Sequence, residues 1–293
     1  MVAFFYFYSS KVFKMNFTSP LITATDLHEN FSNPNLILLD CTIDKVGQSL
    51  KNDILELIPS SHFFDLEEKF SDKSNPLPHT IVNEQVFTDE AQKLGINQDS
   101  IIVCYDRWGI YSSPRVWWMF KLMGHKNVYV LDGGLPEWKN NHFETTSTPI
   151  QHSIKGNFIA DFQSSWLADK QIMLNSINDK SKTLIDARSE GRYKGTSPEP
   201  RKGLRSGHIP TSQNLFFEHV LDGTKYKSQP ELKILFEKIT SSSNEQIFTC
   251  GSGVTASILA LASIIAGFEK VKVYDGSWSE WGADKNLPIE TSK

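Results

Sequence analysis

Short apolar runs alternate along the chain with longer apolar segments. Four short runs have the length and the Ile, Leu, Val and Phe content of buried strands, at 36–40, 101–105, 183–186 and 246–250. Two longer apolar segments have the length of helices, at 114–124 and 257–267. Buried strands that alternate with helices form parallel sheets with helices on both faces. The pattern therefore predicts an α/β fold.

The chain contains an internal duplication, because residues 101–140 can be laid over residues 246–285. The overlay, with one deletion, aligns four pairs of residues: Asp106 with Cys250, Gly109 with Gly253, Asp132 with Asp275 and Trp138 with Trp281. We therefore predict two domains of one plan, at 16–145 and 158–293. The stretch 146–157 is polar, contains Pro and Gly and lacks periodicity, which is typical of a linker.

The composition excludes several classes of function. With 293 residues, 39% of them hydrophobic, the chain is long enough for two globular domains with cores. The net charge of −4 leaves no basic excess for a nucleic-acid backbone, so no nucleic-acid partner is expected. The three cysteines form no CxxC pair and indicate neither a disulfide framework nor a metal site. We expect no metal, no cofactor and a reducing compartment: the cytoplasm, or alternatively the mitochondrial matrix.

The N-terminal apolar run at 2–8 is far shorter than the roughly 20 residues of a membrane-spanning helix. Lys11 and Lys14 follow this run, whereas a signal peptide has its positive charge first. No membrane partner is therefore expected, and Met15 is an alternative start of the protein.

Cys250 is the candidate nucleophile, since it ends an apolar strand and precedes a glycine-containing loop and a helix. Backbone N–H groups of such a loop and the positive end of a helix dipole form a cradle for an anion. A cradle of this kind stabilises both a thiolate and a persulfide anion. The residues expected to form it are Gly251, Gly253, Val254 and Thr255.

Cys250 has three other possible roles. A buried structural cysteine is the plainest alternative, and the Gly-x-Gly loop behind Cys250 argues against it. A cysteine phosphatase needs an arginine six positions after the nucleophile, where this chain has Ala256. A cysteine hydrolase needs a histidine base, and the nearest candidate, His208, lies in a turn where a structural hydrogen bond is expected.

Three segments resemble the rhodanese superfamily, and in particular the 3-mercaptopyruvate sulfurtransferases. CGSGVTA at 250–256 is similar to their active-site loop, where thiosulfate sulfurtransferases carry two basic residues after the cysteine. YDGSWSEW at 274–281 is similar to the C-terminal signature, and 186–210 resembles the substrate-binding segment. The resemblance extends over both halves of the chain and implies tandem rhodanese-like domains. It also implies that the first domain, with Asp106 at the cysteine position, is inactive.

The resemblance implies a sulfur transfer in which Cys250 takes sulfur from 3-mercaptopyruvate as a persulfide, pyruvate leaves, and a thiol or cyanide accepts the sulfur. It implies further that Arg192 and Arg201 hold the carboxylate and carbonyl oxygens of the donor, a task suited to the planar fork of arginine. The alternative for each arginine is a surface ion pair, above all for Arg201, which lies beside Glu199 and Lys202. Arg192 is therefore the stronger candidate.

Ser252 is a second candidate catalytic residue, placed to pass a proton to the departing enolate. Some members of the superfamily are thought to use this serine with a His and an Asp of the first domain. The first-domain turn that usually reads HIPGA has Leu57 at the position of the His. We therefore predict that a relay through that position is absent and that Ser252 acts through water or only as a hydrogen-bond donor. His62, five residues later, is expected to be structural.

Alternative functions remain open at this point. A thiosulfate:cyanide sulfurtransferase uses the same chemistry, but the neutral residues after Cys250 favour mercaptopyruvate over a dianion. A persulfide carrier without small-molecule turnover has less need of two arginines, and a silent scaffold has no need of an intact cysteine loop. The expected partners are a small-molecule sulfur donor and a thiol acceptor, such as a thioredoxin-like protein or a small thiol.

The remaining candidates are expected to be structural. Buried packing is expected of Trp117, Trp118, Met119, Phe120, Cys41 and Cys104. Asp40 and Asp186 are expected to brace loops, and Asp132 and Asp275 to fix the turns before the final helices.

Overall fold

The computed structural model describes residues 19–150 and 154–291, so the apolar run at 2–8 and Met15 lie outside the described residues. Two five-stranded sheets share one strand order, β1-β5-β4-β2-β3 and β6-β12-β11-β7-β8, and every pairing in them is parallel. This arrangement confirms the predicted α/β fold with parallel sheets. We call the part built on the first sheet the first half and the part built on the second sheet the second half.

The elements follow the same order in both halves. The first half contains β1 (Leu21–Ile22), α1 (Ala24–Glu29), β2 (Leu36–Asp40), β3 (Ser61–Phe63), α2 (Glu84–Lys93), β4 (Ile101–Tyr105), α3 (Ser113–Leu122), β5 (Val128–Leu131) and α4 (Gly134–Asn140). The second half contains η1 (Ser164–Trp166), β6 (Leu167–Ala168), α5 (Lys170–Ser176), β7 (Lys182–Asp186), α6 (Glu190–Lys194), β8 (Gln213–Asn214), η2 (Phe217–Val220), β9 (Leu221–Asp222), β10 (Lys225–Tyr226), α7 (Gln229–Glu237), β11 (Glu245–Thr249), α8 (Val254–Ile265), β12 (Val271–Tyr274) and α9 (Ser277–Trp281). None of these helices is long and apolar enough to cross a membrane.

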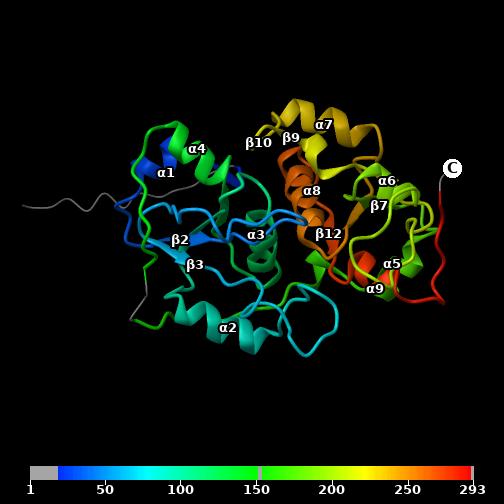
Figure 1. Ribbon diagram of the computed structural model, residues 1–293, viewed down its shortest axis with the longest axis horizontal. Helices are drawn as coiled ribbons and strands as arrows, with labels where there is room; N and C mark the ends of the chain where they lie inside the picture. The colour runs from blue at the N-terminus through cyan, green and yellow to red at the C-terminus, as the bar shows by residue number, and fades with distance from the viewer. Residues whose placement is uncertain (1–18, 151–153, 292–293) are drawn as a thin grey trace, which may run out of the picture.

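Helices cover both faces of the sheets, as the alternation of side chains along β4 shows. Ile102 and Cys104 belong to an apolar cluster with residues of α2 and α3, whereas Val103 and Tyr105 belong to a cluster with residues of α1 and α4. Figure 1 shows α2 on one side of the first sheet and α1 and α4 on the other. The second sheet is covered in the same way, by α7 and α8 on one face and α5 and α9 on the other.

The two halves share one hydrophobic core, because a single cluster contains residues of both sheets and of α3 and α8. These two helices face each other at the centre of the molecule (Figure 1). The predicted core packing in α3 is confirmed, since the residues in question are fully or almost fully buried: Trp117, Trp118, Met119 and Phe120. The indole N–H of Trp118 donates to the carbonyl of Trp166 at 3.0 Å, which ties α3 to the start of the second half.

The segment between the halves packs on the first half where it is described. The N–H of Gly156 donates to the carbonyl of Gln92 at 2.8 Å, and Phe158 is buried against Phe87. The domain limits at 145 and 158 stay predictions.

Two of the structural expectations concern buried thiols and carboxylates at strand ends, and both are confirmed. Cys41 and Cys104 are fully buried, and burial raises the pKa of the Cys41 thiol well above its usual value, which keeps it unreactive. Asp40 accepts a hydrogen bond from the N–H of Thr42 at 3.1 Å, and Asp186 accepts one from the N–H of Arg188 at 2.9 Å. Each aspartate thus braces the loop that follows its own strand.

Asp132 and Asp275 correct the expectation that they fix the turns before the final helices. The carboxylate of Asp132 accepts from the N–H of Tyr226 in the second half at 3.0 Å. The carboxylate of Asp275 accepts from the N–H of Ile81 in the first half, also at 3.0 Å. The duplicated pair therefore forms two related hydrogen bonds between the halves. Local sequence patterns do not reveal this role, because the bonded residues lie far apart in the chain.

Candidate active site

The loop after Cys250 is held by α9. The N–H groups of Trp278 and Ser279 donate to the carbonyls of Cys250 and Gly251 at 2.9 and 3.0 Å. The hydroxyl of Ser279 donates to the carbonyl of Gly251 as well, at 2.6 Å. Cys250 is itself only 2% exposed. The segment recognised as a C-terminal signature thus fixes the carbonyl side of the cysteine loop.

Gly253 is required at the start of α8. It is the N-cap residue of the helix, with φ of +83°, a conformation that costs other residues energy. A Cβ atom at this position would lie 2.9 Å from Nη1 of Arg115, a residue of the first half. The predicted loop glycine therefore serves the close approach of the two halves rather than lining the cavity described below.

Arg192 and Arg201 both reach the cysteine loop. Arg192 lies on α6 and Arg201 in the loop that follows it. A Cβ atom added to Gly251 would lie 3.2 Å from Nη2 of Arg192 and 3.6 Å from Nη1 of Arg201. Gly251 leaves the space for two guanidinium groups beside Cys250, which is the arrangement predicted for binding a carboxylate.

The ion pairs of the two arginines are the reverse of the sequence-based expectation. Glu199, whose side chain is 1% exposed, accepts from Nη2 of Arg192 at 2.6 Å and from Nη1 of Arg188 at 2.8 Å. No carboxylate of the described residues pairs with Arg201. The alternative of an ion pair therefore applies to Arg192, whose orientation Glu199 sets, and Arg201 keeps its charge free for a ligand.

A cavity of about 230 Å³ brings the predicted residues together at the junction of the halves. The second half lines it with seven of the eight predicted site residues, all except Gly253: Cys250, Gly251, Ser252, Val254, Thr255, Arg192 and Arg201. The first half lines it with Ile43, Asp44, Lys45, Val46, Glu67, His79 and Tyr111. Burial raises the pKa of the Tyr111 hydroxyl to about 12, so this wall carries a neutral phenol at neutral pH. Both halves therefore line the cavity, although the candidate nucleophile comes from the second half alone.

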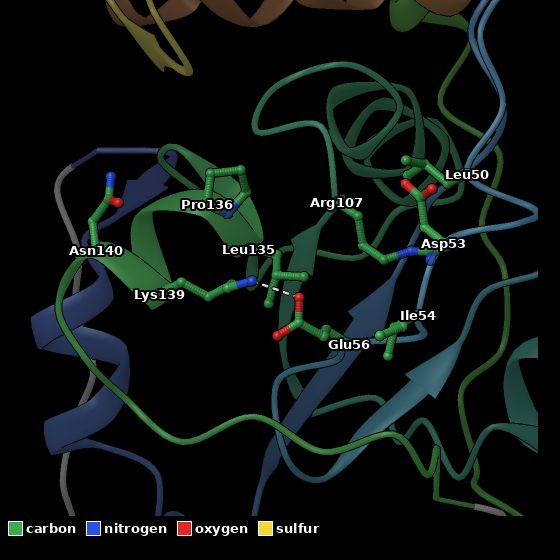
Figure 2. A pocket seen from close by; sticks show the side chains of 9 residues that line it. All are labelled: Leu50, Asp53, Ile54, Glu56, Arg107, Leu135, Pro136, Lys139 and Asn140. Carbon is green, nitrogen blue, oxygen red and sulfur yellow. Dashed lines mark hydrogen bonds and ion pairs between the residues drawn. The ribbon is translucent and has the colours of Figure 1, made fainter.

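A larger cavity, of about 530 Å³, lies in the first half and is drawn in Figure 2. Arg107, next to Asp106, is one of its lining residues and extends toward Asp53, and an ion pair joins the lining side chains of Lys139 and Glu56. Its lining contains neither a cysteine nor a serine or histidine. Size alone therefore does not identify the reactive site of this chain.

The loop of the first half holds a built-in anion where the second half has Cys250. The carboxylate of Asp106 accepts from the N–H groups of Tyr111, Ser112 and Ser113 at 2.9, 3.0 and 3.0 Å, and from the Ser113 hydroxyl at 2.7 Å. The duplication aligns these three N–H groups with those of the first turn of α8. A backbone cradle for an anion is thus present in the same motif of the same chain.

His79 is a functional candidate that the sequence analysis missed. Its Nδ1 lies 3.0 Å from the hydroxyl oxygen of Ser252, across 173 residues of sequence. Its Nε2 lies 3.7 Å from Oε1 of Glu67. The predicted absence of a histidine at position 57 holds, since Leu57 is buried there, but His79, 22 positions later in the chain, contacts Ser252 instead. How Ser252 acts stays a prediction.

Local sequence carried no signal for this contact. His79 lies in an irregular loop between β3 and α2, where neither a strand nor a helix period marks it. Its environment excludes the proton: burial, and then the charges of Arg115 and Arg201, lower the pKa of His79 to about 4. The imidazole is therefore neutral at pH 7 and able to accept the Ser252 proton at Nδ1.

His208 and His62 have the structural positions expected of them. His208 is 4% exposed, shares a 2.8 Å hydrogen bond with the carbonyl of Tyr193 through Nδ1, and stacks on the Tyr193 ring. His62 is buried in β3, outside the lining of the cavity at Cys250.

Comparisons with known proteins agree with the fold and its duplication. The sequence profile of the rhodanese-like domain matches the chain twice, at 23–141 and 169–284. A mouse protein named 3-mercaptopyruvate sulfurtransferase is 39% identical over 85% of this chain and 86% of its own length. An Arabidopsis thaliana protein named thiosulfate/3-mercaptopyruvate sulfurtransferase 1, mitochondrial, is 36% identical over 94% of this chain and 79% of its own length. The crystal structure of SseA from Escherichia coli, titled as a "rhodanese" fold of 3-mercaptopyruvate sulfotransferases, has a TM-score of 0.80 and 31% identity and covers 90% of this chain and 100% of that one.

Proposed function

This chain belongs to the rhodanese family and is a sulfurtransferase, and we propose that it moves sulfur from 3-mercaptopyruvate to a thiol or cyanide through a persulfide on Cys250. Pyruvate is the other product of the first step. The relatives named above make a sulfur donor and an acceptor the substrate classes of the enzyme. The observations on Cys250 and its surroundings support the finer assignment.

The main support for a persulfide is the Asp106 carboxylate, an anion that backbone N–H groups hold in the first half. The Asp106 carboxylate lies in a cradle of three backbone N–H groups, and Cys250 occupies the equivalent position before α8. A persulfide extends the cysteine by one atom and ends in a negative charge, as the carboxylate of an aspartate does. The same backbone dipoles therefore stabilise the outer sulfur on Cys250.

The first step forms one S–S bond and breaks one C–S bond. The Cys250 thiolate attacks the thiol sulfur of mercaptopyruvate, and the electron pair of the C–S bond leaves with the carbon as an enolate. The thiol proton of the donor ends on the methyl carbon of pyruvate. In the second step an acceptor thiol attacks the outer sulfur and regenerates Cys250, so the scheme is ping-pong.

Ser252 and His79 supply the path for that proton. The neutral imidazole accepts the serine hydroxyl proton at Nδ1, 3.0 Å away, while Ser252 takes the donor's thiol proton. The same two groups return a proton to the enolate carbon. Glu67, 3.7 Å from Nε2, stabilises the positive imidazole formed in between.

Variants of Arg201 and Arg192 are expected to differ in thermal stability, because only Arg192 has an ion pair among the described residues. Arg201→Met is expected to lower kcat/KM for mercaptopyruvate by about 10- to 100-fold, the value of a charge-assisted hydrogen bond, with no change in Tm. Arg192→Met is expected to lower both kcat/KM and Tm, because buried Glu199 loses a partner. Steady-state kinetics and thermal melts measure both. Lys202→Met, at an exposed neighbouring position, is the control; a loss there equal to that of Arg201→Met contradicts the assignment.

Donor preference tests the function. The residues after Cys250 are neutral, and the two arginines suit a monocarboxylate, so kcat/KM is expected to be higher for mercaptopyruvate than for thiosulfate. The runner-up, a thiosulfate:cyanide sulfurtransferase, is favoured by the name of the Arabidopsis relative. Rates with both donors, each measured with cyanide and with a dithiol as acceptor, decide between them. A higher value for thiosulfate overturns the proposal.

A persulfide carrier without turnover is a further alternative, and the free charge of Arg201 beside the loop argues against it. A carrier releases one pyruvate per chain and stops, whereas the proposed enzyme continues while a thiol is present. A thioredoxin-like protein or a small thiol is the proposed acceptor. We propose the cytoplasm as the compartment, with the mitochondrial matrix as the alternative, and cell fractionation distinguishes them.

A further inference from the structure

We infer that Arg115 is a positioning residue for the proton relay: from the first half it holds His79 in line with Ser252 and is itself anchored on Asp275. The inference rests on the proposed function, and it assigns a role to a side chain that does not line the cavity at Cys250.

Arg115 is enclosed at the junction of the halves. It lies on α3 and its side chain is fully buried. Its Nη2 donates to the carbonyl oxygen of His79 at 2.7 Å and to Oδ1 of Asp275. The guanidinium lies over the ring of Trp118, 4.4 Å from its centroid. One group of the first half therefore joins the histidine loop to the end of β12 in the second half.

The same contacts fix a strained piece of backbone. His79 has φ of +59°, in the left-handed region that residues other than glycine adopt only when their surroundings impose it. Arg115 holds the carbonyl of His79, and Asp275 holds the N–H of Ile81 at 3.0 Å. The two ends of a three-residue segment are thus pinned by one ion pair, which directs the imidazole toward Ser252.

The position of the charge adds to the effect of the geometry. Nε and Nη1 of Arg115 are buried and have no hydrogen-bond partner among the described residues. Nη1 lies 2.9 Å from the place where Gly253 would carry a Cβ atom. The guanidinium therefore lies beneath the start of α8 with part of its charge uncompensated.

The groups that face His79 come from both halves. Glu67 and Lys73 belong to its own loop region, Arg115 to α3, Arg201 to the loop after α6, and Asp275 to the end of β12. After burial, Arg115 is the largest cause of the lowered pKa of His79, and Asp275 acts in the opposite direction. Without Arg115 the pKa of His79 rises toward its ordinary value of 6.5, and the imidazole becomes protonated at a higher pH. Protonated His79 cannot accept the Ser252 proton, so activity is lost on the acid side.

The test is the pH profile of kcat/KM for mercaptopyruvate with a dithiol acceptor. Wild type is expected to keep its activity down to a pH near 4, the value for His79, after correction for the ionisation of the donor. Arg115→Met is expected to move the acid limb, the pH range in which kcat/KM falls on acidification, to higher pH. Arg115→Met/Asp275→Asn removes the ion pair as a whole, avoids a lone buried charge, and is expected to move the limb upward by less. Arg115→Lys keeps the charge but not the fork, so kcat is expected to fall by about 10- to 100-fold with the limb unmoved.

The chain offers a matched control in the duplicated position. Asp132→Asn weakens the corresponding hydrogen bond between the halves, to Tyr226, at a distance from His79, and is expected to leave the limb where it is. If Arg115→Met and the double variant lose activity equally at every pH, Arg115 is only structural and the inference is wrong.

A direct titration of the His79 imidazole by NMR, assigned with His79→Asn, keeps this inference separate from the proposed function. It is expected to show the higher pKa in the double variant whether or not mercaptopyruvate is the donor. An unchanged His79 titration overturns the positioning role. Absence of turnover in wild type with mercaptopyruvate overturns the proposed function instead.

Discussion

Cys250→Ser is expected to lower kcat/KM for mercaptopyruvate by roughly four orders of magnitude or more, as the loss of a covalent nucleophile does. A serine hydroxyl stays protonated at neutral pH and forms no bond that can hold a sulfur atom for transfer. The change removes little volume, and the carbonyl of residue 250 still accepts from the N–H of Trp278. The variant should therefore fold, and the loss is chemical. Release of pyruvate in the presence of a dithiol measures it.

Cys104→Ser is the control for this result. Cys104 is fully buried inside β4 and does not line the cavity at Cys250. We expect it to keep its turnover and to lose only thermal stability, because a buried hydroxyl replaces a thiol. Retention of more than about a tenth of the wild-type rate by Cys250→Ser would contradict nucleophilic catalysis at this residue.

A second large effect is expected from the two residues after the nucleophile. Gly251→Arg/Ser252→Lys is expected to raise the ratio of kcat/KM for thiosulfate to that for mercaptopyruvate by about 100-fold or more, since two charge-assisted hydrogen bonds are added for a dianion. The ratio changes for two separate physical reasons: the added charges raise the rate with thiosulfate, and changes in the loop lower the rate with mercaptopyruvate. A side chain at 251 displaces Arg192, whose Nη2 is 3.2 Å from the Cβ position, and the change at 252 removes the hydroxyl that contacts His79.

The matched control for this switch is Gly251→Ala/Ser252→Ala. It adds the same Cβ atom at 251 and removes the same hydroxyl at 252 without adding charge, so it is expected to reduce the rate with mercaptopyruvate and to gain nothing with thiosulfate. Kinetics with both donors give the ratio. An equal ratio in the charged and the alanine variants would show that loop charge does not select the donor.

Most of the fold could be predicted because it follows from the local pattern of apolar residues along the chain. The apolar runs at 36–40 and 101–105 are short, are buried on both sides and recur in the second half, and this pattern is enough to predict parallel sheets between helices. Cys250 and its loop could be recognised from the sequence in the same way, because a strand, two glycines and a helix follow one another directly around Cys250.

Contacts between the halves could not be predicted in this way. His79 and Ser252 are 173 positions apart, and Arg115 and Asp275 are 160 positions apart. No local pattern records such a distance, and the loop that carries His79 has no period. The same limit explains why the ion pairs of the arginines were not predicted: Glu199 is two positions from Arg201 in sequence but pairs with Arg188 and Arg192 in space.

The half without a cysteine in its loop still contributes a wall of the cavity. Asp106 makes its own cradle permanently occupied, whereas the wall opposite Cys250 contributes His79, Glu67 and Tyr111. A second half alone would keep Cys250 and the arginines but lose the imidazole that contacts Ser252. The first half contributes to the site through the side chains that line the cavity opposite Cys250.

The intact mass of the protein after exposure to mercaptopyruvate alone, without an acceptor, tests the central claim most directly. A chain whose Cys250 loop holds an anionic sulfur is expected to gain the mass of one sulfur atom, to lose it when a thiol is added, and to gain none as Cys250→Ser. A wild-type chain that releases pyruvate with its mass unchanged, or that gains sulfur equally as Cys250→Ser, would contradict the persulfide.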